Sequence, residues 1–292
     1  MSKKQNSFVL TDDNYYTSEA DKLFCSASQY KDIIGCPAIP GCEARALATI
    51  NGEWQRETTN ALLVGSILDT LWELSDMSSE ERSQIIIDRF PDCVSSRGAT
   101  KGELKSEFKK CIQLYERTYK DPTFRAYMSG NKQTIMTGDI NGLPFKIKMD
   151  SFIEGKAIVD LKTTEDASMR FRKFVPDSGE RLPFYLLWGY DIQLAIYREI
   201  VRQNTGDTLE CYIAAVDKKS HPLPVIINLI PQLLDEALDK VKMNCEKIIG
   251  LKSGEIEPFR CDSGDCDFCR DTYECKVISS SEFETFDVNG GA

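Results

Sequence analysis

The chain has 292 residues and a formal net charge of −10 at pH 7, with 41% hydrophobic and 28% charged residues. This is the composition of a globular protein with ample core, and the acidic balance argues against non-specific coating of polyanions. No apolar run approaches the length that crosses a bilayer, and the N-terminus lacks the apolar stretch of a signal peptide. We therefore expect a cytoplasmic protein without a membrane partner.

The first part of the chain is expected to be mostly helical. Residues 1–25 are polar and predict a flexible arm. Ser26 to Leu47 predicts a Ser-capped short helix, a break that contains proline, and a second helix. Asn60 to Met77 has apolar residues at helical spacing and predicts a buried helix. On that helix Gly65 and Asp69, four positions apart, share one face.

A charged segment at about residues 80–127 predicts a helical insertion that is interrupted near Pro91 and around residues 95–102. Its middle helix carries a lysine stripe that fits either a solvated helix face or a DNA contact. The stripe consists of Lys101, Lys105, Lys109 and Lys110.

Strands follow this helical segment. Residues 132–148 predict two strands joined by Asn141-Gly142, because Asn-Gly between alternating runs is a strong hairpin signal. The alternation continues to a second turn at residues 154–156 and a further strand. The sequence therefore predicts a meander from about Thr134 to Thr163.

The second of these hairpins brings together three ionisable side chains. Asp160 and Lys162 point to one face of their strand, while Leu161 points to the opposite packing layer. The hairpin folds Asp150 back towards them. Two carboxylates and an ammonium suit a hard divalent cation such as Mg²⁺, with the lysine offsetting charge on a phosphate. The pattern also fits a cross-strand ion pair on a solvated sheet face.

Residues 170–174 alternate cations and aromatic side chains, which fits either a nucleic-acid path or a surface loop. Leu186 to Gln203 predicts an amphipathic helix, on which Gln193 and Tyr197 share a face within reach of the sheet edge. The remaining predicted elements are a strand at residues 209–216 and a long helix at residues 230–249.

Eleven cysteines are more than packing requires in a reducing compartment, and four lie between Cys261 and Cys275. Clustered thiolates suit Zn²⁺ or an iron–sulfur cluster. One open ligand set is local and consists of Cys261, Cys266, Cys269 and Cys275. The other joins Cys266, Cys269 and Cys275 to Cys36 or Cys42. An unliganded tail is a third interpretation. We expect buried, apolar-like side chains at Cys25, Cys93, Cys111, Cys211 and Cys245.

Three separate segments share one resemblance. Gly65-x-x-x-Asp69, Asp150, Asp160-x-Lys162 and Gln193-x-x-x-Tyr197 resemble the motifs of the PD-(D/E)xK nuclease superfamily, most closely its RecB-like branch and the phage exodeoxyribonuclease VIII (RecE) type. The resemblance spans about Ser26 to Cys275. It implies a restriction-endonuclease-like α/β core at residues 26–260, with a mixed central sheet flanked by helices. It also implies metal-dependent exonucleolytic hydrolysis of linear DNA.

The resemblance assigns roles to individual residues. Asp150 and Asp160 would bind Mg²⁺ or Mn²⁺, and Lys162 would be the catalytic lysine. Gln193 and Tyr197 would help to position that lysine and the DNA backbone.

Two further positions bear on the resemblance. Asp69 stands where the branch usually has histidine, and it would be an additional metal ligand. The chain's single histidine, His221, matches nothing in the pattern, so serine or cysteine hydrolysis with a histidine base has little support.

The cysteines also resemble those of AddB-type and CRISPR-adaptation exonucleases, which hold a 4Fe-4S cluster with one N-terminal and three C-terminal cysteines. This implies a Cys-rich staple at residues 261–280 that closes on the nuclease domain, and a loose tail at 281–292. The implied ligands are Cys36, Cys266, Cys269 and Cys275, with Zn²⁺ as the alternative to the cluster.

The partners implied by the resemblance are linear duplex ends, a single-strand annealing protein of phage-type recombination, and further copies of the chain in a homo-oligomer. The alternative function is a DNA-end-binding protein without catalytic activity.

Overall fold

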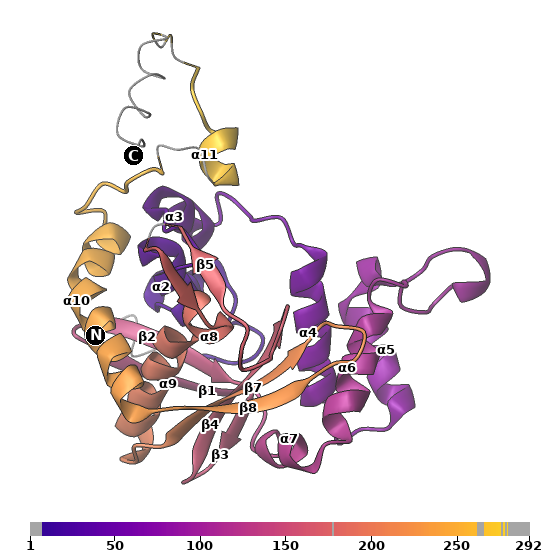
Figure 1. The fold of residues 1–292 in the computed structure, drawn as a ribbon. Coiled ribbons are helices and arrows are strands. Elements are labelled where there is room, and N and C mark those ends of the chain that lie inside the picture. Colours follow the sequence, from indigo (N-terminus) through magenta and orange to yellow (C-terminus); the bar gives the residue numbers. More distant parts are fainter. Residues whose placement is uncertain (1–7, 177, 262–265, 276, 278, 280–292) are drawn as a thin grey trace, which may run out of the picture.

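The structure is a computed structural model that describes residues 8–176, 178–261, 266–275, 277 and 279. Its central sheet consists of β3 (Ser151–Ile153), β4 (Ala157–Thr164), β7 (Glu210–Asp217) and β8 (Pro224–Leu229), in the order β3-β4-β7-β8 (Figure 1). The β3-β4 and β7-β8 pairs are antiparallel, whereas β4 and β7 run parallel. The predicted α/β fold with a mixed sheet is confirmed.

A separate antiparallel hairpin is formed by β1 (Thr134–Ile140) and β2 (Leu143–Met149). Its turn residues Asn141 and Gly142 have φ of 49° and 83°, the positive values that a tight hairpin turn requires. The predicted Asn-Gly hairpin is therefore confirmed. The predicted meander is wrong, because the chain changes ladders at Asp150 and β4 takes β7 as its second neighbour.

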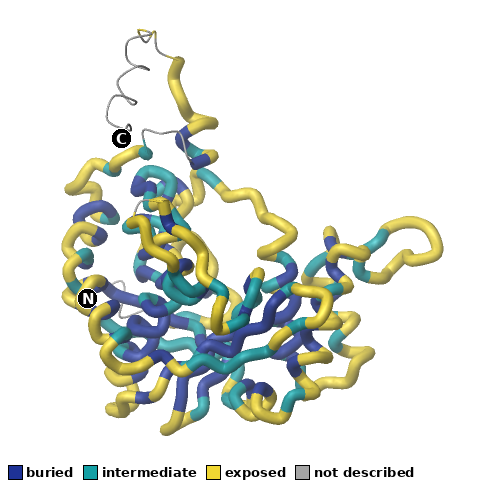
Figure 2. The backbone as a smooth tube through the Cα atoms, in the orientation of Figure 1, coloured by how far each residue is buried: buried dark blue, intermediate teal, exposed yellow. Residues whose placement is uncertain are grey.

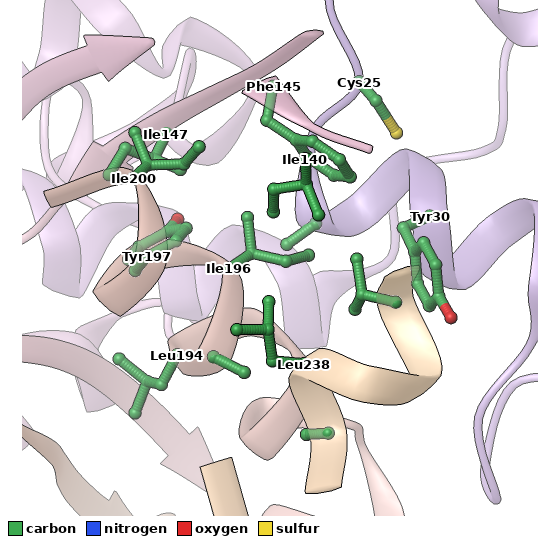
Figure 3. Close-up of a cluster of buried hydrophobic side chains, with 14 of the residues drawn as sticks. Cys25, Tyr30, Ile140, Phe145, Ile147, Leu194, Ile196, Tyr197, Ile200 and Leu238 are labelled. Carbon is green, nitrogen blue, oxygen red and sulfur yellow. The ribbon is translucent and has the colours of Figure 1, made fainter. Parts of the chain in front are cut away.

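Helices cover both faces of the sheet, and the alternation of side chains along β4 divides the core in two. Ile158 packs into one cluster, while Val159 and Leu161 pack into the other. The first cluster includes side chains of α9 (Tyr190–Thr205) and α10 (Pro231–Ser253). Figure 3 shows this packing, with side chains of α9 facing those of α10 and of the β1-β2 hairpin.

The other face is covered mainly by helices from the middle of the chain (Figure 1). They are α4 (Asn60–Glu73), α5 (Ser79–Arg89), α6 (Lys109–Tyr119) and α7 (Pro122–Tyr127), with short 3-10 helices at Pro91–Cys93 and Gly98–Thr100. The predicted interruption coincides with the largely exposed connection from α5 to α6 (Figure 2). Because Cys111 and Leu114 of α6 are fully buried, this helical segment supplies part of the core.

The N-terminal segment differs from the expected flexible arm. Within its described part, α1 (Ser18–Leu23) is N-capped by Thr17, and Phe24 is buried. Lys146 of β2 is buried and forms an ion pair with Asp21 at 2.7 Å. A buried charge requires such a partner, so this contact fixes the segment to the β1-β2 hairpin.

Two further helices lie near the N-terminus, α2 (Ala27–Ile34) and α3 (Glu43–Asn51). Ser26 caps α2 through its side chain, as the sequence predicts, and Cys42 stands at the N-cap position of α3. The chain between the two helices turns tightly, because Gly41 lies directly against the backbone of Ile33.

The connection from β4 to the parallel strand β7 is a long crossover, as parallel pairing requires. It contains a small antiparallel hairpin, then α8 (Phe184–Leu187), and finally α9. The hairpin strands are β5 (Lys173–Val175) and β6 (Glu180–Leu182). Neither this hairpin nor β8 is predicted from the sequence.

The chain returns to the N-terminal helices after α10, which ends at Ser253 and is capped by Gly254. The backbone N–H of Ala44 donates to the Phe259 carbonyl at 3.1 Å, and α11 (Asp267–Asp271) follows near α3 (Figure 1). Among the described residues, no helix combines the length and hydropathy that a membrane span needs.

Candidate active site and thiolate cluster

The catalytic candidates lie where β2 gives way to β3, beside the neighbouring strand β4. Asp150 occupies this break, and its carboxylate accepts the backbone N–H of Leu161 at 2.7 Å. Ser151 is registered with Val159, so the β3-β4 ladder places Asp150 beside Asp160. The structure thus brings Asp150 next to the Asp160-x-Lys162 stretch of β4.

Asp160 is held by one neighbour on each carboxylate oxygen. Its Oδ1 accepts from Nε2 of Gln193 at 2.7 Å, and its Oδ2 forms an ion pair with Nζ of Lys162 at 2.5 Å. The side chain is only 2% exposed. A buried carboxylate oxygen that faces an ammonium group can also serve as an oxygen ligand for a divalent cation.

Gln193 and Tyr197 form a short relay on α9. Nε2 of Gln193 also donates to the Tyr197 hydroxyl at 3.2 Å, and this hydroxyl donates to the Lys148 carbonyl at 3.1 Å. Burial raises the pKa of Tyr197 well above its usual value, so the phenol stays protonated as a donor. The relay therefore orients Asp160, whereas the resemblance implies that these residues position Lys162.

Asp69 joins the two other carboxylates from α4. Burial, followed by the nearby charge of Asp150, raises the pKa of Asp69 well above its usual value. Burial and the charge of Asp160 raise the pKa of Asp150 to about 6. Burial alone would lower the pKa of Lys162, but Asp160 and Asp150 raise it above that of a free lysine. Three crowded carboxylates beside one ammonium favour a divalent cation, and the all-oxygen donor set fits Mg²⁺ or Mn²⁺.

The site also contains Gln133, which the sequence analysis does not identify. Gln133 has φ of 49°, an uncommon value for a residue other than glycine, and its Nε2 donates to Asp150 at 3.3 Å. The sequence carries no signal for this position, since the contact depends on the chain turning into β1.

A cleft of about 700 Å³ opens onto Asp69 and Lys162. Cationic and aromatic side chains from distant segments share its lining. They include Lys31, Arg45, Trp54, Arg56, Phe171, Lys173, Trp188 and Tyr190. Phe171 and Lys173 belong to the alternating stretch at residues 170–174, whereas Phe174 is 52% exposed and does not line the cleft. Lys31 and Tyr190 are further cleft residues that the sequence analysis does not identify.

A cluster of four cysteines lies near the cleft. Its sulfur atoms all lie within 4.8 Å of one another, and they belong to Cys42, Cys261, Cys266 and Cys269. The Sγ atoms of Cys42 and Cys269 are 3.6 Å apart, and those of Cys261 and Cys266 are 3.2 Å apart. One N-terminal and three C-terminal thiols thus meet and could bind a metal.

Two of the predicted ligands are not part of this cluster. The Cys36 thiol contacts the Leu187 carbonyl at 3.7 Å and packs beside Gly189 at the start of α9. Because the chain turns between α2 and α3, Cys42 reaches the cluster instead of Cys36. Cys275 is exposed, since it follows the end of the short helix α11.

The remaining cysteines are buried, as predicted. They are Cys25, Cys93, Cys111, Cys211 and Cys245. Burial raises the pKa of Cys111 and Cys211 to about 12, so these thiols stay protonated in the core.

Comparison with family models and with solved structures shows the family of this chain. The model of a PDDEXK-like domain of unknown function matches residues 26–272. The chain belongs to this family. The predicted PD-(D/E)xK superfamily is therefore confirmed.

A crystal structure of a protein from Eubacterium rectale, named "Putative exonuclease", is 41% identical to this family member. The match covers 97% of this chain and 100% of that chain, with a TM-score of 0.86. A second solved structure, of SSO0001, is 10% identical with a TM-score of 0.28, over 71% of this chain and 85% of that chain, and supports no conclusion. None of the curated proteins matches the chain.

Proposed function

We propose that this family member is a metal-dependent exonuclease that hydrolyses phosphodiester bonds of linear DNA. The observation that carries the proposal is the convergence of Asp69, Asp150, Asp160 and Lys162, of which Asp69 and Lys162 line a cleft rich in cationic and aromatic side chains. The PDDEXK-like family and the name of the Eubacterium rectale relative support the same activity.

The three carboxylates would hold Mg²⁺ or Mn²⁺, which when bound polarises the phosphate and lowers the pKa of a water molecule. Lys162 keeps its proton because Asp160 and Asp150 raise its pKa, so its ammonium can offset the charge that develops on the phosphate. Gln193 holds the Asp160 carboxylate, while the Leu161 N–H and Gln133 hold that of Asp150. These donors fix both carboxylates before substrate arrives.

The lining of the cleft suits a nucleic-acid strand. Trp54, Phe171 and Trp188 offer aromatic faces for bases, and Arg56 and Lys173 offer charge for phosphates. A local cationic surface of this kind is compatible with an acidic protein, because attraction of a strand depends on the nearby field and not on net charge alone.

For the thiolate cluster we propose a single Zn²⁺. Four sulfurs at a zinc–sulfur distance of 2.3 Å form a tetrahedron with edges of about 3.8 Å. The observed spacings of 3.6 and 3.2 Å are close to that value. A 4Fe-4S cluster places iron and sulfide between the thiolates and needs them further apart. Bound zinc with no absorbance in the visible range supports this assignment, whereas a brown protein with stoichiometric iron contradicts it.

The exonuclease proposal is tested with linear duplex DNA labelled at either the 5′ or the 3′ end. We expect the Mg²⁺-loaded protein to release labelled nucleotides from one end first, and to leave covalently closed circular duplex intact. A chelator should stop the release. Binding of linear DNA without any release in Mg²⁺ or Mn²⁺ would support the non-catalytic DNA-end binder instead. Recombination with an annealing partner and assembly into a homo-oligomer stay predictions, which co-purification and sedimentation would test.

A further inference from the structure

Lys31 of α2 is a buried ammonium without an acidic partner. The residue is 7% exposed, and the acceptor that the described residues offer to its Nζ is the Trp188 carbonyl at 3.2 Å. No carboxylate of the described residues forms an ion pair with it. Burial, followed by the nearby charge of Lys162, lowers its pKa. A buried ammonium without a carboxylate in direct contact destabilises the free protein, so its presence needs another explanation.

The position of Lys31 relates it directly to the catalytic lysine. Both ammonium groups lie over the ring of Tyr190, with Nζ 5.3 Å from its centroid for Lys31 and 5.1 Å for Lys162. Both residues line the same cleft. They are therefore close enough to contact one phosphate or two neighbouring phosphates of a single strand.

The backbone beside Tyr190 keeps Lys31 in this place. Gly189 has φ of 61°, and a Cβ added there would lie 3.0 Å from Cδ of Lys31 and 3.1 Å from Cβ of Cys36. A larger residue at position 189 would push against the lysine stem.

We propose that Lys31 is a second phosphate-binding residue, which holds a phosphate of the substrate strand next to the one that is cleaved. The proposal rests on the nuclease function and deepens it. Lys162 is already paired with Asp160 at 2.5 Å, whereas two of the three N–H groups of Lys31 have no acceptor among the described residues. A phosphate oxygen would supply both the missing acceptor and the missing negative charge.

Lys31→Met tests this role, because methionine keeps the length of the buried stem and removes the charge. We expect KM for a single-stranded oligonucleotide to rise about tenfold, and inhibition by a deoxynucleoside 5′-monophosphate to weaken similarly. The slope of log affinity against log salt should decrease in magnitude by about 0.7, the value for one phosphate contact on a single strand. Thermal stability should be unchanged or higher, and Lys31→Arg should restore part of the affinity.

Lys252→Met is the matched control. Lys252 is a partly buried lysine of α10 that does not line the cleft, and its Nζ donates to the carbonyls of Asp21 and Phe24 at 2.7 and 2.9 Å. This variant should lose stability and keep the wild-type KM and salt slope. An active Lys31→Met protein with wild-type KM, inhibition and salt slope would overturn the proposal while leaving the nuclease function standing. A wild-type protein that binds the oligonucleotide in a Lys31-dependent manner without cleaving it would overturn only the nuclease function.

Discussion

The carboxylate site and the thiolate cluster are built in opposite ways. Asp160 lies in β4 of the central sheet and Asp150 directly precedes β3, and backbone and side-chain donors hold both independently of any metal. The thiols join the start of α3 to the segment after α10, alongside two hydrogen bonds, from the Ala44 N–H to the Phe259 carbonyl and from the Phe259 N–H to the Glu43 carboxylate. A metal bound by the carboxylates would add chemistry to a site that is already formed. A metal bound by the thiols would instead stabilise the fold itself.

The two regions nevertheless meet at the cleft. Trp54, which follows α3, packs edge to face on Phe268 of α11, with ring centroids 5.9 Å apart. Trp54 and Cys266 line the same cleft as Lys162. Loss of the thiolate metal should therefore loosen one wall of the substrate path without altering the carboxylates.

The largest expected effect on stability comes from the thiolate cluster. Cys42→Ser and Cys261→Ser should each remove the bound metal and lower the free energy of unfolding by several kcal/mol, because folding and metal binding are coupled. Cys36→Ser and Cys275→Ser are the controls and should retain the metal. Elemental analysis with thermal unfolding measures both quantities. Retention of metal by Cys261→Ser together with its loss from Cys275→Ser would refute the proposed ligand set.

Removal of a carboxylate should have the opposite effect on stability from removal of a thiol. The pKa of Asp150 is about 6 in the folded chain and 3.8 in the reference state, so the folded state binds the extra proton between these values. Without divalent metal, stability contributed by this group is highest at acidic pH and falls as pH rises through about 6. Asp150→Asn should therefore stabilise the metal-free protein at neutral pH by on the order of 2 kcal/mol. Denaturant unfolding at pH 7.5 in chelator measures this gain, and a loss of stability would contradict it.

Protonation of Asp150 should also lower the affinity of this site for a divalent metal. Protons compete with Mg²⁺ or Mn²⁺ for Asp150, so the apparent affinity should fall by about fivefold between pH 6 and pH 5 for one displaced proton. Calorimetric titration with Mn²⁺ at several pH values checks the dependence. An affinity that does not change across this range would show that Asp150 is not a ligand.

The smallest expected effect concerns the relay on α9. Tyr197→Phe removes the hydroxyl that accepts from Gln193 and donates to the Lys148 carbonyl, which should cost about 1 kcal/mol of stability. Because Gln193 keeps its contact with Asp160, turnover should fall less than in Gln193→Leu. Steady-state kinetics of the two variants separates the roles, and equal loss of turnover would assign Tyr197 a direct part in the reaction.

The two sites also differ in how well the sequence predicts them. Asp150, Asp160 and Lys162 are linked by a short hairpin and strand alternation, and Gln193 and Tyr197 by helical spacing, so local periodicity predicts their grouping. Cys36 and Cys42 are separated by a tight turn whose direction depends on the contact of Gly41 with Ile33. No local pattern contains that information, so the sequence leaves Cys36 and Cys42 as alternatives and only the structure shows that Cys42 joins the four-cysteine cluster.

Long-range pairing limits the prediction of the fold in the same way. The β1-β2 hairpin follows from Asn141-Gly142, but the parallel pairing of β4 with β7 forms across a crossover of many residues. Gln133 and Lys31 reach the cleft only because of such distant contacts. Neither could be identified before the tertiary structure was known.

Asp160→Asn tests most directly whether the site formed by the carboxylates and Lys162 hydrolyses DNA. The measurement is nucleotide release from end-labelled linear duplex in Mg²⁺, with Asp239→Asn on the exposed side of α10 as the matched control. We expect Asp160→Asn to reduce the rate on the order of 1,000-fold while the protein stays folded and binds DNA, and the control to keep the wild-type rate. A folded Asp160→Asn protein that degrades DNA at the wild-type rate would contradict the assignment of this site.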